Sequence, residues 1–261
     1  MARVRLDEAV ALREGTTRSQ ARSLIMEGRV SVAGAVATKA GQSVPGDARI
    51  EVRAPRRFVS RGGEKLAHAL TAFGIDPAGA QALDVGASTG GFSDCLLQRG
   101  AAHVTAVDVG YGQLDWRLRN DPRVTVIERA NFRKLADDAF PAPFGLIAID
   151  VSFISLRPIL ARAVGYLHDD GVVVALLKPQ FEAGRARVGS GGVVRDPQTH
   201  AAVIRDVRAA AIAMGLVPVH LVASPLTGPA GNREFFVELR RRGRPFDDAR
   251  IAEVLGEMPP A

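Results

Sequence analysis

The stretch LDVGASTGG, residues 83–91, decides how the larger part of this chain folds. It joins an apolar, strand-like run to a glycine-rich loop, and the helix-like stretch FSDCLLQRG follows. In an open α/β sheet, ligands bind at the carboxyl ends of the strands, and glycines let the backbone approach them closely. The next apolar run ends in Asp108, about 20 residues beyond Gly86, where a carboxylate can accept hydrogen bonds from ribose hydroxyls. The pattern therefore indicates a site for a nucleoside-bearing cofactor.

The spacing within the loop favours one class of cofactor. The pattern D-x-G-x-x-x-G-G departs from the dinucleotide pattern G-x-G-x-x-G, because Ser88 occupies the place of the second glycine. Asp84 would repel a pyrophosphate but would attract a cationic amine. We therefore favour S-adenosylmethionine (SAM), with a dinucleotide or a purely structural turn as the alternatives.

Outward from the loop, residues 81–261 alternate between short apolar runs and helix-length stretches. This alternation predicts a doubly wound α/β sheet, Rossmann-like and mostly parallel, with seven strands. The last two runs are joined only by the loop SPLTGPAGNR, which predicts an antiparallel last strand. The expected strands are QALDVG, HVTAVDVG, VTVIER, GLIAIDVS, GVVVALLKP, VPVHLVASP and EFFVELR.

The first 60 residues predict a separate small α+β domain. Helices are expected over 6–14 and 18–28, with Thr17 as a cap and Gly28 as a stop, and short strands follow up to residue 53. Residues 1–65 hold 13 of the 34 Lys and Arg residues but 7 of the 28 Asp and Glu residues, and the rest of the chain is balanced. The excess favours docking on a polyanion, although a solvated face is the alternative. A short linker, residues 54–57, follows the last of these strands. We expect the first domain to cover residues 1–60 and the larger one residues 61–261.

Composition excludes several other classes. No apolar run approaches the roughly 20 residues that cross a bilayer, and the first 15 residues are too charged for a signal peptide, so we expect a cytoplasmic protein and no membrane partner. Cys95 is the single cysteine, which excludes an internal disulfide and a cysteine-based zinc site. The five histidines show no metal-ligand spacing, so we expect no metal.

Charged residues at the ends of apolar runs form a candidate catalytic set. Asp150 ends GLIAI and Lys178 ends VVVALL, while Glu234 opens the last run. A charge directly after a buried strand is costly unless it emerges into a cleft. With Lys65, these residues could align a ribose hydroxyl and remove its proton, and Lys178 is the expected base. Lys65 would position the substrate, and the two acids would orient Lys178 and the hydroxyl.

The segments FVSRGGEKL, VDVGYGQLDWRLRNDPRV, IDVSFISL, LLKPQFE and SPLTGPAGNREFF, together with the loop, resemble the TlyA family of ribosomal RNA methyltransferases, also long labelled haemolysins. The second domain is similar to the FtsJ class of ribose 2′-O-methyltransferases. The resemblance implies cytidine 2′-O-methylation of ribosomal RNA or ribosomal subunits, with no obligate protein partner evident. It places the catalytic tetrad on Lys65, Asp150, Lys178 and Glu234, with Glu238 as a second choice for the last role. The expected cofactor contacts are Asp84, Gly86, Ser88, Gly90, Gly91, Phe92, Asp108, Asn131 and Asp150.

The first domain resembles the RNA-binding domain of a small-subunit ribosomal protein (number four) in RSQARSLIMEGRVSVAG and Lys39. It departs from that pattern at Ala33, where asparagine is common. Two other classes remain open at this point, a haemolysin-type membrane-active protein and an RNA-binding assembly factor without catalysis. The candidate RNA-binding residues are Arg3, Arg5, Arg18, Arg22, Arg29 and Arg61.

Four aromatic residues have two interpretations each. Tyr111 and Trp116 could wall an adenosine pocket or pack a helix. Phe153 and Phe181 could stack a flipped-out base or serve simple packing. The polar segment 182–197 could form a mobile lip over the substrate or an ordinary exposed loop.

Overall fold

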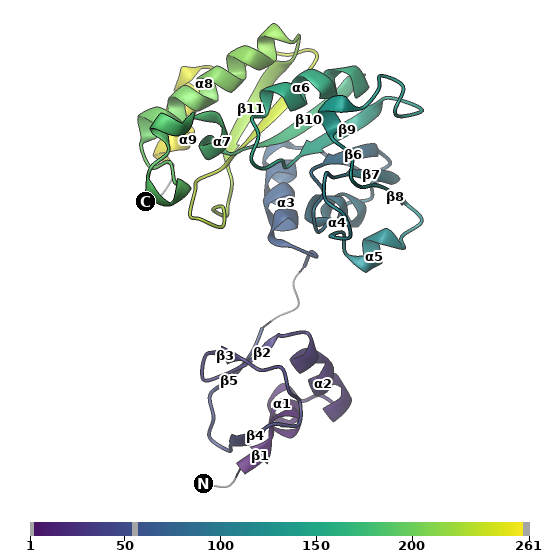
Figure 1. The fold of residues 1–261 in the computed structure, drawn as a ribbon, viewed down its shortest axis with the longest axis vertical. Helices are drawn as coiled ribbons and strands as arrows, with labels where there is room; N and C mark the ends of the chain where they lie inside the picture. Colours follow the sequence, from purple (N-terminus) through teal and green to yellow (C-terminus); the bar gives the residue numbers. More distant parts are fainter. Residues whose placement is uncertain (1–2, 54–56, 258–261) are drawn as a thin grey trace. The chain divides into compact units, whose positions relative to one another are not determined.

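The computed structural model describes residues 3–53 and 57–257, and the chain divides into two units, Met1–Arg56 and Arg57–Ala261. Figure 1 shows both units. Residues 54–56 of the predicted linker lie outside the described residues. The domain boundary expected after residue 60 remains a prediction.

The first unit combines two helices with two small antiparallel sheets. Thr17 caps the second helix: its Oγ1 accepts a hydrogen bond from the Gln20 N–H, as the sequence predicted. Ala33 and Gly34 both have positive φ, 48° and 84°, which is the geometry of a tight two-residue hairpin turn. The elements are α1 (Leu6–Glu14), α2 (Arg18–Met26), β1 (Arg3–Arg5) paired with β4 (Ser43–Pro45), and β2 (Val30–Val32) between β3 (Ala35–Val36) and β5 (Ile50–Val52).

The second unit is built on a seven-stranded sheet with the order β11-β12-β10-β9-β6-β7-β8. Strands β6 to β10 are parallel, and β12 is antiparallel to both of its neighbours. The predicted Rossmann-like fold with an antiparallel last strand is therefore confirmed. The strands are β6 (Gln81–Val85), β7 (His103–Val107), β8 (Val124–Ile127), β9 (Phe144–Ile149), β10 (Leu167–Leu177), β11 (Val217–Ala223) and β12 (Phe235–Arg240).

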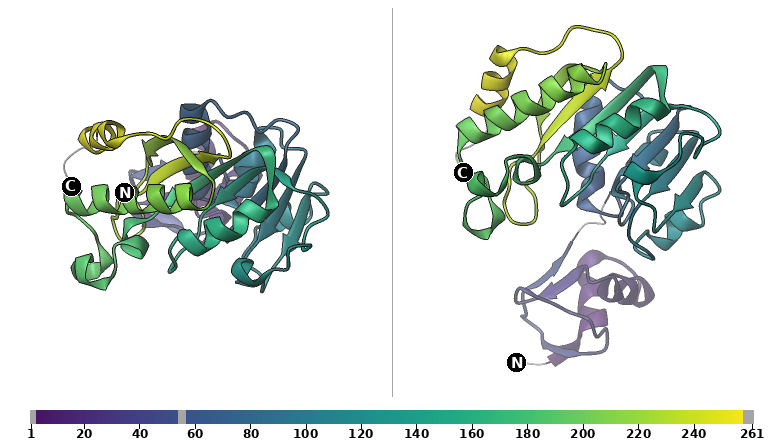
Figure 2. Two further views of the ribbon diagram at one scale, coloured as in Figure 1. Left: turned by 90° about the horizontal axis from the view of Figure 1, so that it is seen from above. Right: turned by 45° about the horizontal axis from the view of Figure 1, so that its top comes forward.

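Helices cover both faces of this sheet, as two views of the ribbon show (Figure 2). One apolar cluster includes residues of α3 (Arg61–Phe73), α4 (Gly91–Gln98) and α5 (Trp116–Arg119). The other cluster includes residues of α6 (Arg157–Ala163), α8 (Pro197–Ala213) and α9 (Asp248–Gly256). The short helix α7 (Pro179–Glu182) directly follows β10. These two clusters form the three-layer core expected of a doubly wound sheet.

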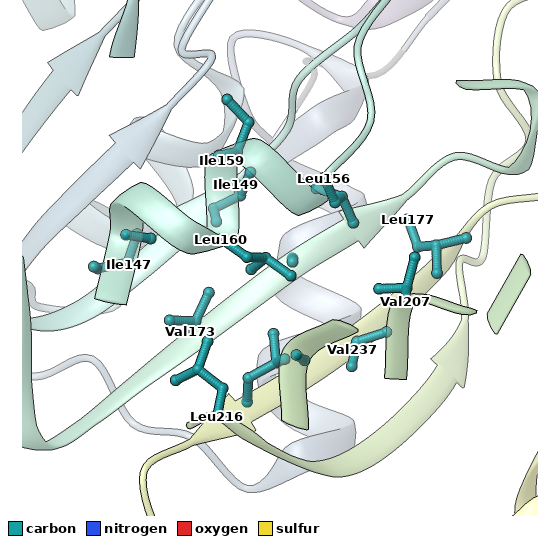
Figure 3. Packing of buried hydrophobic residues seen from close by; sticks show 14 of the residues in the cluster. Ile147, Ile149, Leu156, Ile159, Leu160, Val173, Leu177, Val207, Leu216 and Val237 are labelled. Atoms are coloured by element: carbon teal, nitrogen blue, oxygen red, sulfur yellow. The ribbon is translucent and has the colours of Figure 1, made fainter. Parts of the chain in front are cut away.

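Side chains alternate along each strand, and this alternation decides which face of the sheet a polar residue lies on. Ile147, Ile149 and Val173 pack in the cluster with α6 and α8 (Figure 3). Side chains alternate between the faces of a sheet, so the even-numbered positions of β9 and β10 point to the other face, with α3. Continued past the strand ends, this alternation places Asp150 and Lys178 at the edge of the face that α3 covers.

Candidate active site

Close backbone contacts shape the loop between β6 and α4. Gly86 has φ +87°, and a Cβ there would lie 2.4 Å from the carbonyl oxygen of Asp150. Only glycine fits at this position, because the backbone of Asp150, at the end of the neighbouring strand β9, is too near. Ser88 adopts φ +47°, the left-handed conformation that glycine usually supplies. The loop is therefore held tightly against the carboxyl end of β9.

Asp108 follows β7, and its carboxylate is tied to the same loop. Its Oδ2 accepts a hydrogen bond from the Ser88 N–H at 2.8 Å, and its Oδ1 accepts one from the Gly110 N–H at 2.6 Å. Each carboxylate oxygen keeps a second lone pair that can accept from a bound molecule. Asp108 can therefore bind ribose hydroxyls while it orders the loop.

A cleft of about 470 Å³ opens beside the loop. Apolar side chains that suit a flat purine ring stand in this cleft beside the Asp108 carboxylate, and its volume is that of a small-molecule site. The residues present therefore fit a nucleoside-bearing cofactor such as SAM. The expected contacts that line the cleft are Gly86, Ser88, Asp108, Asn131 and Asp150. The lining that sequence reasoning did not single out includes Val85, Val107, Val109, Gln113, Phe132, Ser152, Ile154 and Ile159.

Four of the expected cofactor contacts do not line this cleft, and the expectation of direct contact is revised for them. Asp84 is fully buried, and its Oδ2 accepts hydrogen bonds from the Ser93 N–H and hydroxyl at 2.9 and 2.6 Å. Burial raises the pKa of Asp84 to about 7. Gly90 and Gly91 pack where a Cβ would meet Leu118 or Ser60, and Phe92 is buried. These four residues support the loop on the side that faces away from the cleft.

The four residues of the predicted tetrad come together as two ion pairs. The Lys65 Nζ contacts the Glu234 Oε2, and the Lys178 Nζ lies 2.6 Å from the Asp150 Oδ1. Leu177 pairs with Phe235 across β10 and β12, so the residues that adjoin them, Lys178 and Glu234, lie at the same end of neighbouring strands. Because β12 is antiparallel to β10, Glu234, which directly precedes β12, lies at the edge of the sheet where the parallel strands end. The two pairs therefore share one edge and one face of the sheet.

The two carboxylates differ in exposure. The Glu234 side chain is 1% exposed, whereas the Asp150 side chain is 24% exposed and lines the cleft. The paired lysines, Lys65 and Lys178, are 8% and 11% exposed. Glu238, the second choice for the last tetrad role, lies further inside β12 and contacts the ring of His220 at 2.7 Å. The geometry therefore favours Glu234 over Glu238 as the partner of Lys65.

Two polar residues near the tetrad were missed by sequence reasoning. The Lys178 Nζ donates a hydrogen bond to the Ser152 Oγ at 2.8 Å, so Ser152 and Asp150 hold the same amine. Asn232, 2% exposed, accepts from the Val194 N–H at 2.9 Å and donates to the Gly192 carbonyl at 2.8 Å. Ser152 lies two positions after Asp150, and Asn232 lies two positions before Glu234. This proximity to a tetrad acid could have been used to find them in the sequence. Asn232 anchors the end of the 182–197 segment.

Two phenylalanines stand beside the ion pair of Lys178. Phe153 is 91% exposed and has φ +64°, an uncommon conformation for a bulky side chain. Its ring centroid lies 5.2 Å from that of Phe181. A second hollow of about 470 Å³ is lined by these two rings with Gln180, Gly184, Arg185 and Val188. An exposed ring held in a strained conformation beside a hollow is suited to stacking, so packing alone does not explain Phe153.

Tyr111 and Trp116 lie outside the lining of the cofactor cleft. Their exposed fractions are 67% and 71%, so neither interpretation from the sequence, a pocket wall or helix packing, describes them. The Arg129 guanidinium stacks over the Tyr111 ring at 4.0 Å.

The structure brings three of the candidate RNA-binding arginines together. Arg5, Arg18 and Arg22 all donate hydrogen bonds to the buried carboxylate of Asp7. The Arg5 guanidinium, followed by Arg22 and Arg18, holds the pKa of Asp7 well below its usual range. The other three are separate: Arg3 contacts Ser43, Arg29 contacts the Arg53 carbonyl, and Arg61 of the second unit donates to the Thr227 carbonyl at 2.8 Å.

The sheet order, the glycine loop after β6 and the acid after β7 define the class as a Rossmann-like methyltransferase. The family model for FtsJ-like methyltransferases matches residues 58–241, and the S4 domain model matches residues 4–50. This chain belongs to the FtsJ-like methyltransferase family and, within it, to the TlyA proteins.

The similar proteins span nearly the whole chain. The 16S/23S rRNA (cytidine-2′-O)-methyltransferase TlyA of Mycobacterium tuberculosis is 48% identical, over 92% of this chain and 91% of its own length. Hemolysin A of Brachyspira hyodysenteriae is 40% identical, over 89% and 98%. A solved structure of a hemolysin-named protein from Streptococcus thermophilus has a TM-score of 0.75 at 40% identity and covers 98% of this chain and 96% of that one. Within residues 3–53 and 57–257, no helix has the length and apolar character to span a membrane.

Proposed function

We propose that this chain methylates the 2′-hydroxyl of a cytidine in ribosomal RNA, with SAM as the methyl donor. One observation carries the proposal: Asp150 lines the cofactor cleft and also lies 2.6 Å from the Lys178 amine. This contact supports a role for the Lys178 amine as a proton acceptor beside the position where an activated methyl group would be held. The name of the M. tuberculosis relative states the same activity.

The cofactor supplies a methyl group already activated by its sulfonium. When bound, it would supply that methyl group to the hydroxyl oxygen with its thioether sulfur as the leaving group, and Lys178 would take the proton that the hydroxyl loses. As a free amine, Lys178 would have two N–H groups: one donates to the Ser152 Oγ, and the Asp150 carboxylate, 2.6 Å away in an ion-pair contact, would attract the other. Its lone pair is then left for the hydroxyl proton, which is the alignment that general base catalysis needs.

The buried pair supports this reaction from α3. The Glu234 carboxylate holds the Lys65 amine at the edge of the sheet where the substrate sugar would bind. Lys65 then positions the hydroxyl, and Glu234 positions Lys65.

The cofactor assignments follow from the lining of the cleft. Asp108 would accept from the ribose hydroxyls, and Asn131 would bind the adenine edge among the apolar walls. Gly86 and Ser88 would admit the amino acid end of SAM. Asp84, Gly90, Gly91 and Phe92 hold the loop in shape.

RNA would be bound by both units. The S4 domain would bind RNA phosphates through Arg3, Arg5, Arg18, Arg22 and Arg29, with Arg61 assisting from the second unit. The exposed Phe153 ring, with Phe181, would stack the base of the target nucleotide after it leaves its helix. Since ribosomal RNA is the substrate, the protein would act in the cytoplasm.

The experiment is methyl transfer from tritiated SAM to ribosomal RNA and to intact subunits, followed by digestion to nucleosides. The expected product is 2′-O-methylcytidine, absent when the Lys178→Ala variant is used. Label on a base, or no label with any ribosomal substrate, would contradict the proposal. Leakage of liposomes by the purified protein would instead support the membrane-active alternative.

A further inference from the structure

One buried carboxylate in the S4 domain holds three arginines. Arg5 donates to both oxygens of Asp7, from Nε and Nη2, at 3.0 Å each. Arg18 and Arg22 each donate from Nε to the Oδ2 of Asp7 at 3.1 Å. The arginines come from two segments, the end of β1 and the helix α2, while Asp7 lies in the first turn of α1. We call Arg5, Arg18, Arg22 and Asp7 the arginine cluster.

Exposure within the arginine cluster is divided between its acid and its bases. The Asp7 side chain is fully buried, whereas the side chains of Arg5, Arg18 and Arg22 are 42%, 45% and 53% exposed. Arg18 and Arg22 use Nε for Asp7, which leaves Nη groups for another acceptor. Glu8, half exposed, lies 3.0 Å from the Arg18 Nη1. Three positive charges therefore adjoin two negative ones, of which Asp7 is buried and Glu8 is half exposed.

This arrangement has two opposing physical effects on RNA binding. The negative charge of Asp7 reduces the attraction between this face and a polyanion. Asp7 also orders three long side chains that would otherwise lose rotamer freedom when they bind a phosphate. A guanidinium held in one orientation can present its remaining N–H groups to phosphate oxygens as a planar fork.

We propose that Asp7 is a positioning residue for RNA binding, which orders Arg5, Arg18 and Arg22 into a single site for RNA phosphate. The inference rests on the proposed function, because it takes RNA as the ligand of the S4 domain. It makes a prediction opposite in sign to that of simple electrostatics. Removal of the buried negative charge weakens RNA binding, although the domain becomes more positive.

The test compares two variants that remove the same charge from the same face. Full-length Asp7→Asn and Glu8→Gln are titrated with in vitro transcribed 16S and 23S ribosomal RNA over a range of salt concentrations. Asp7→Asn is expected to raise Kd about five- to twentyfold, because ordering is lost. Glu8→Gln is expected to leave Kd within about twofold of the wild type or to lower it, because the half-exposed Glu8 pairs with Arg18 and Arg5 at the surface, where solvent screens such pairs and they order the side chains weakly. Equal or tighter binding by Asp7→Asn would overturn the proposal.

Two further variants separate this inference from the function on which it rests. Arg22→Ala must also weaken RNA binding, and wild-type affinity in that variant would show that RNA docks elsewhere, which overturns the inference. Methylation of ribosomal RNA at saturating RNA concentration tests the enzyme independently, since the arginine cluster lies outside the catalytic unit. If Asp7→Asn unfolds the S4 domain, Arg22→Lys takes its place, because lysine keeps the charge but loses the Nε contact. Binding by Arg22→Lys as weak as that of Arg22→Ala is expected, and wild-type affinity would contradict the proposal.

Discussion

The two lysine–carboxylate pairs at the sheet edge have the same chemical composition but different surroundings. Glu234, paired with Lys65, is 1% exposed and lies under α3. Asp150, paired with Lys178, is 24% exposed and lines the cofactor cleft. A buried carboxylate depends on its lysine for stability, whereas one that reaches a cleft can exchange partners with water or substrate. On the proposed function, the first pair would position the substrate and the second would take the proton.

The largest expected effect comes from the pair at the cleft. Asp150→Asn should lower kcat about 10²–10³-fold, because the neutral amide no longer holds the Lys178 amine by its charge. The free energy of unfolding should change little, since the side chain is partly hydrated. Methyl transfer in single turnover, with SAM affinity measured in parallel, checks this. A loss explained wholly by weaker SAM binding would remove Asp150 from the proton-transfer step.

A loss of stability is expected from the buried pair. Lys65→Met should lower the free energy of unfolding by about 3 kcal/mol, because Glu234 is left as an unpaired buried charge. Lys178→Met is the matched control and should cost about 1 kcal/mol, because Asp150 reaches the cleft. Urea unfolding of both variants gives the comparison. Equal losses would mean that the two pairs do not differ in the way that their exposure indicates.

The double variant Lys65→Met, Glu234→Leu sharpens the same point. Replacement of both charges by apolar side chains should recover about 2 kcal/mol relative to Lys65→Met alone, because no buried charge remains. Methyl transfer should stay impaired, since the positioning amine is gone. Full activity in a stable double variant would show that the buried pair is structural only.

A third carboxylate on this face, Asp84, is paired with a hydroxyl and an N–H from Ser93. Burial raises its pKa to about 7, so the folded state holds a proton that the unfolded state has lost above its usual pKa. Its contribution to stability is complete at low pH and is lost as pH rises towards 7, by at most about 1.4 kcal/mol per pH unit. Asp84→Asn should remove this part of the slope between pH 5 and 7 in unfolding experiments. An unchanged slope would show that Asp84 is ionised throughout.

The sequence predicted the sheet well because buried strands and glycine turns are local signals. All seven expected strands form, with the antiparallel last strand, although β10 begins earlier than expected, at Leu167. Asp150 and Lys178 stood out because a charge directly after a buried strand is unusual, whereas Glu234 precedes a strand and Lys65 lies in a helix. Their division into two pairs was not predictable, because it depends on how α3 packs over β12.

Other features depended on tertiary contacts that spacing does not reveal. The convergence of Arg5, Arg18 and Arg22 on Asp7 joins residues from three elements, so the sequence indicated an excess of charge but no shared acid. Asp84 was expected in the cleft because it precedes the glycine loop. The pleat of β6 turns its side chain towards α4 instead, where Ser93 binds it.

The central claim is that the Lys178 amine takes the proton from the ribose hydroxyl. Single-turnover methyl transfer by Lys178→Ala, with and without added ethylamine, tests it directly. The rate should fall at least about 10³-fold while SAM binding is kept, and the small amine should restore part of it as its free-base fraction rises with pH. A rate for Lys178→Ala within a few-fold of the wild type, with no response to ethylamine, would contradict the account.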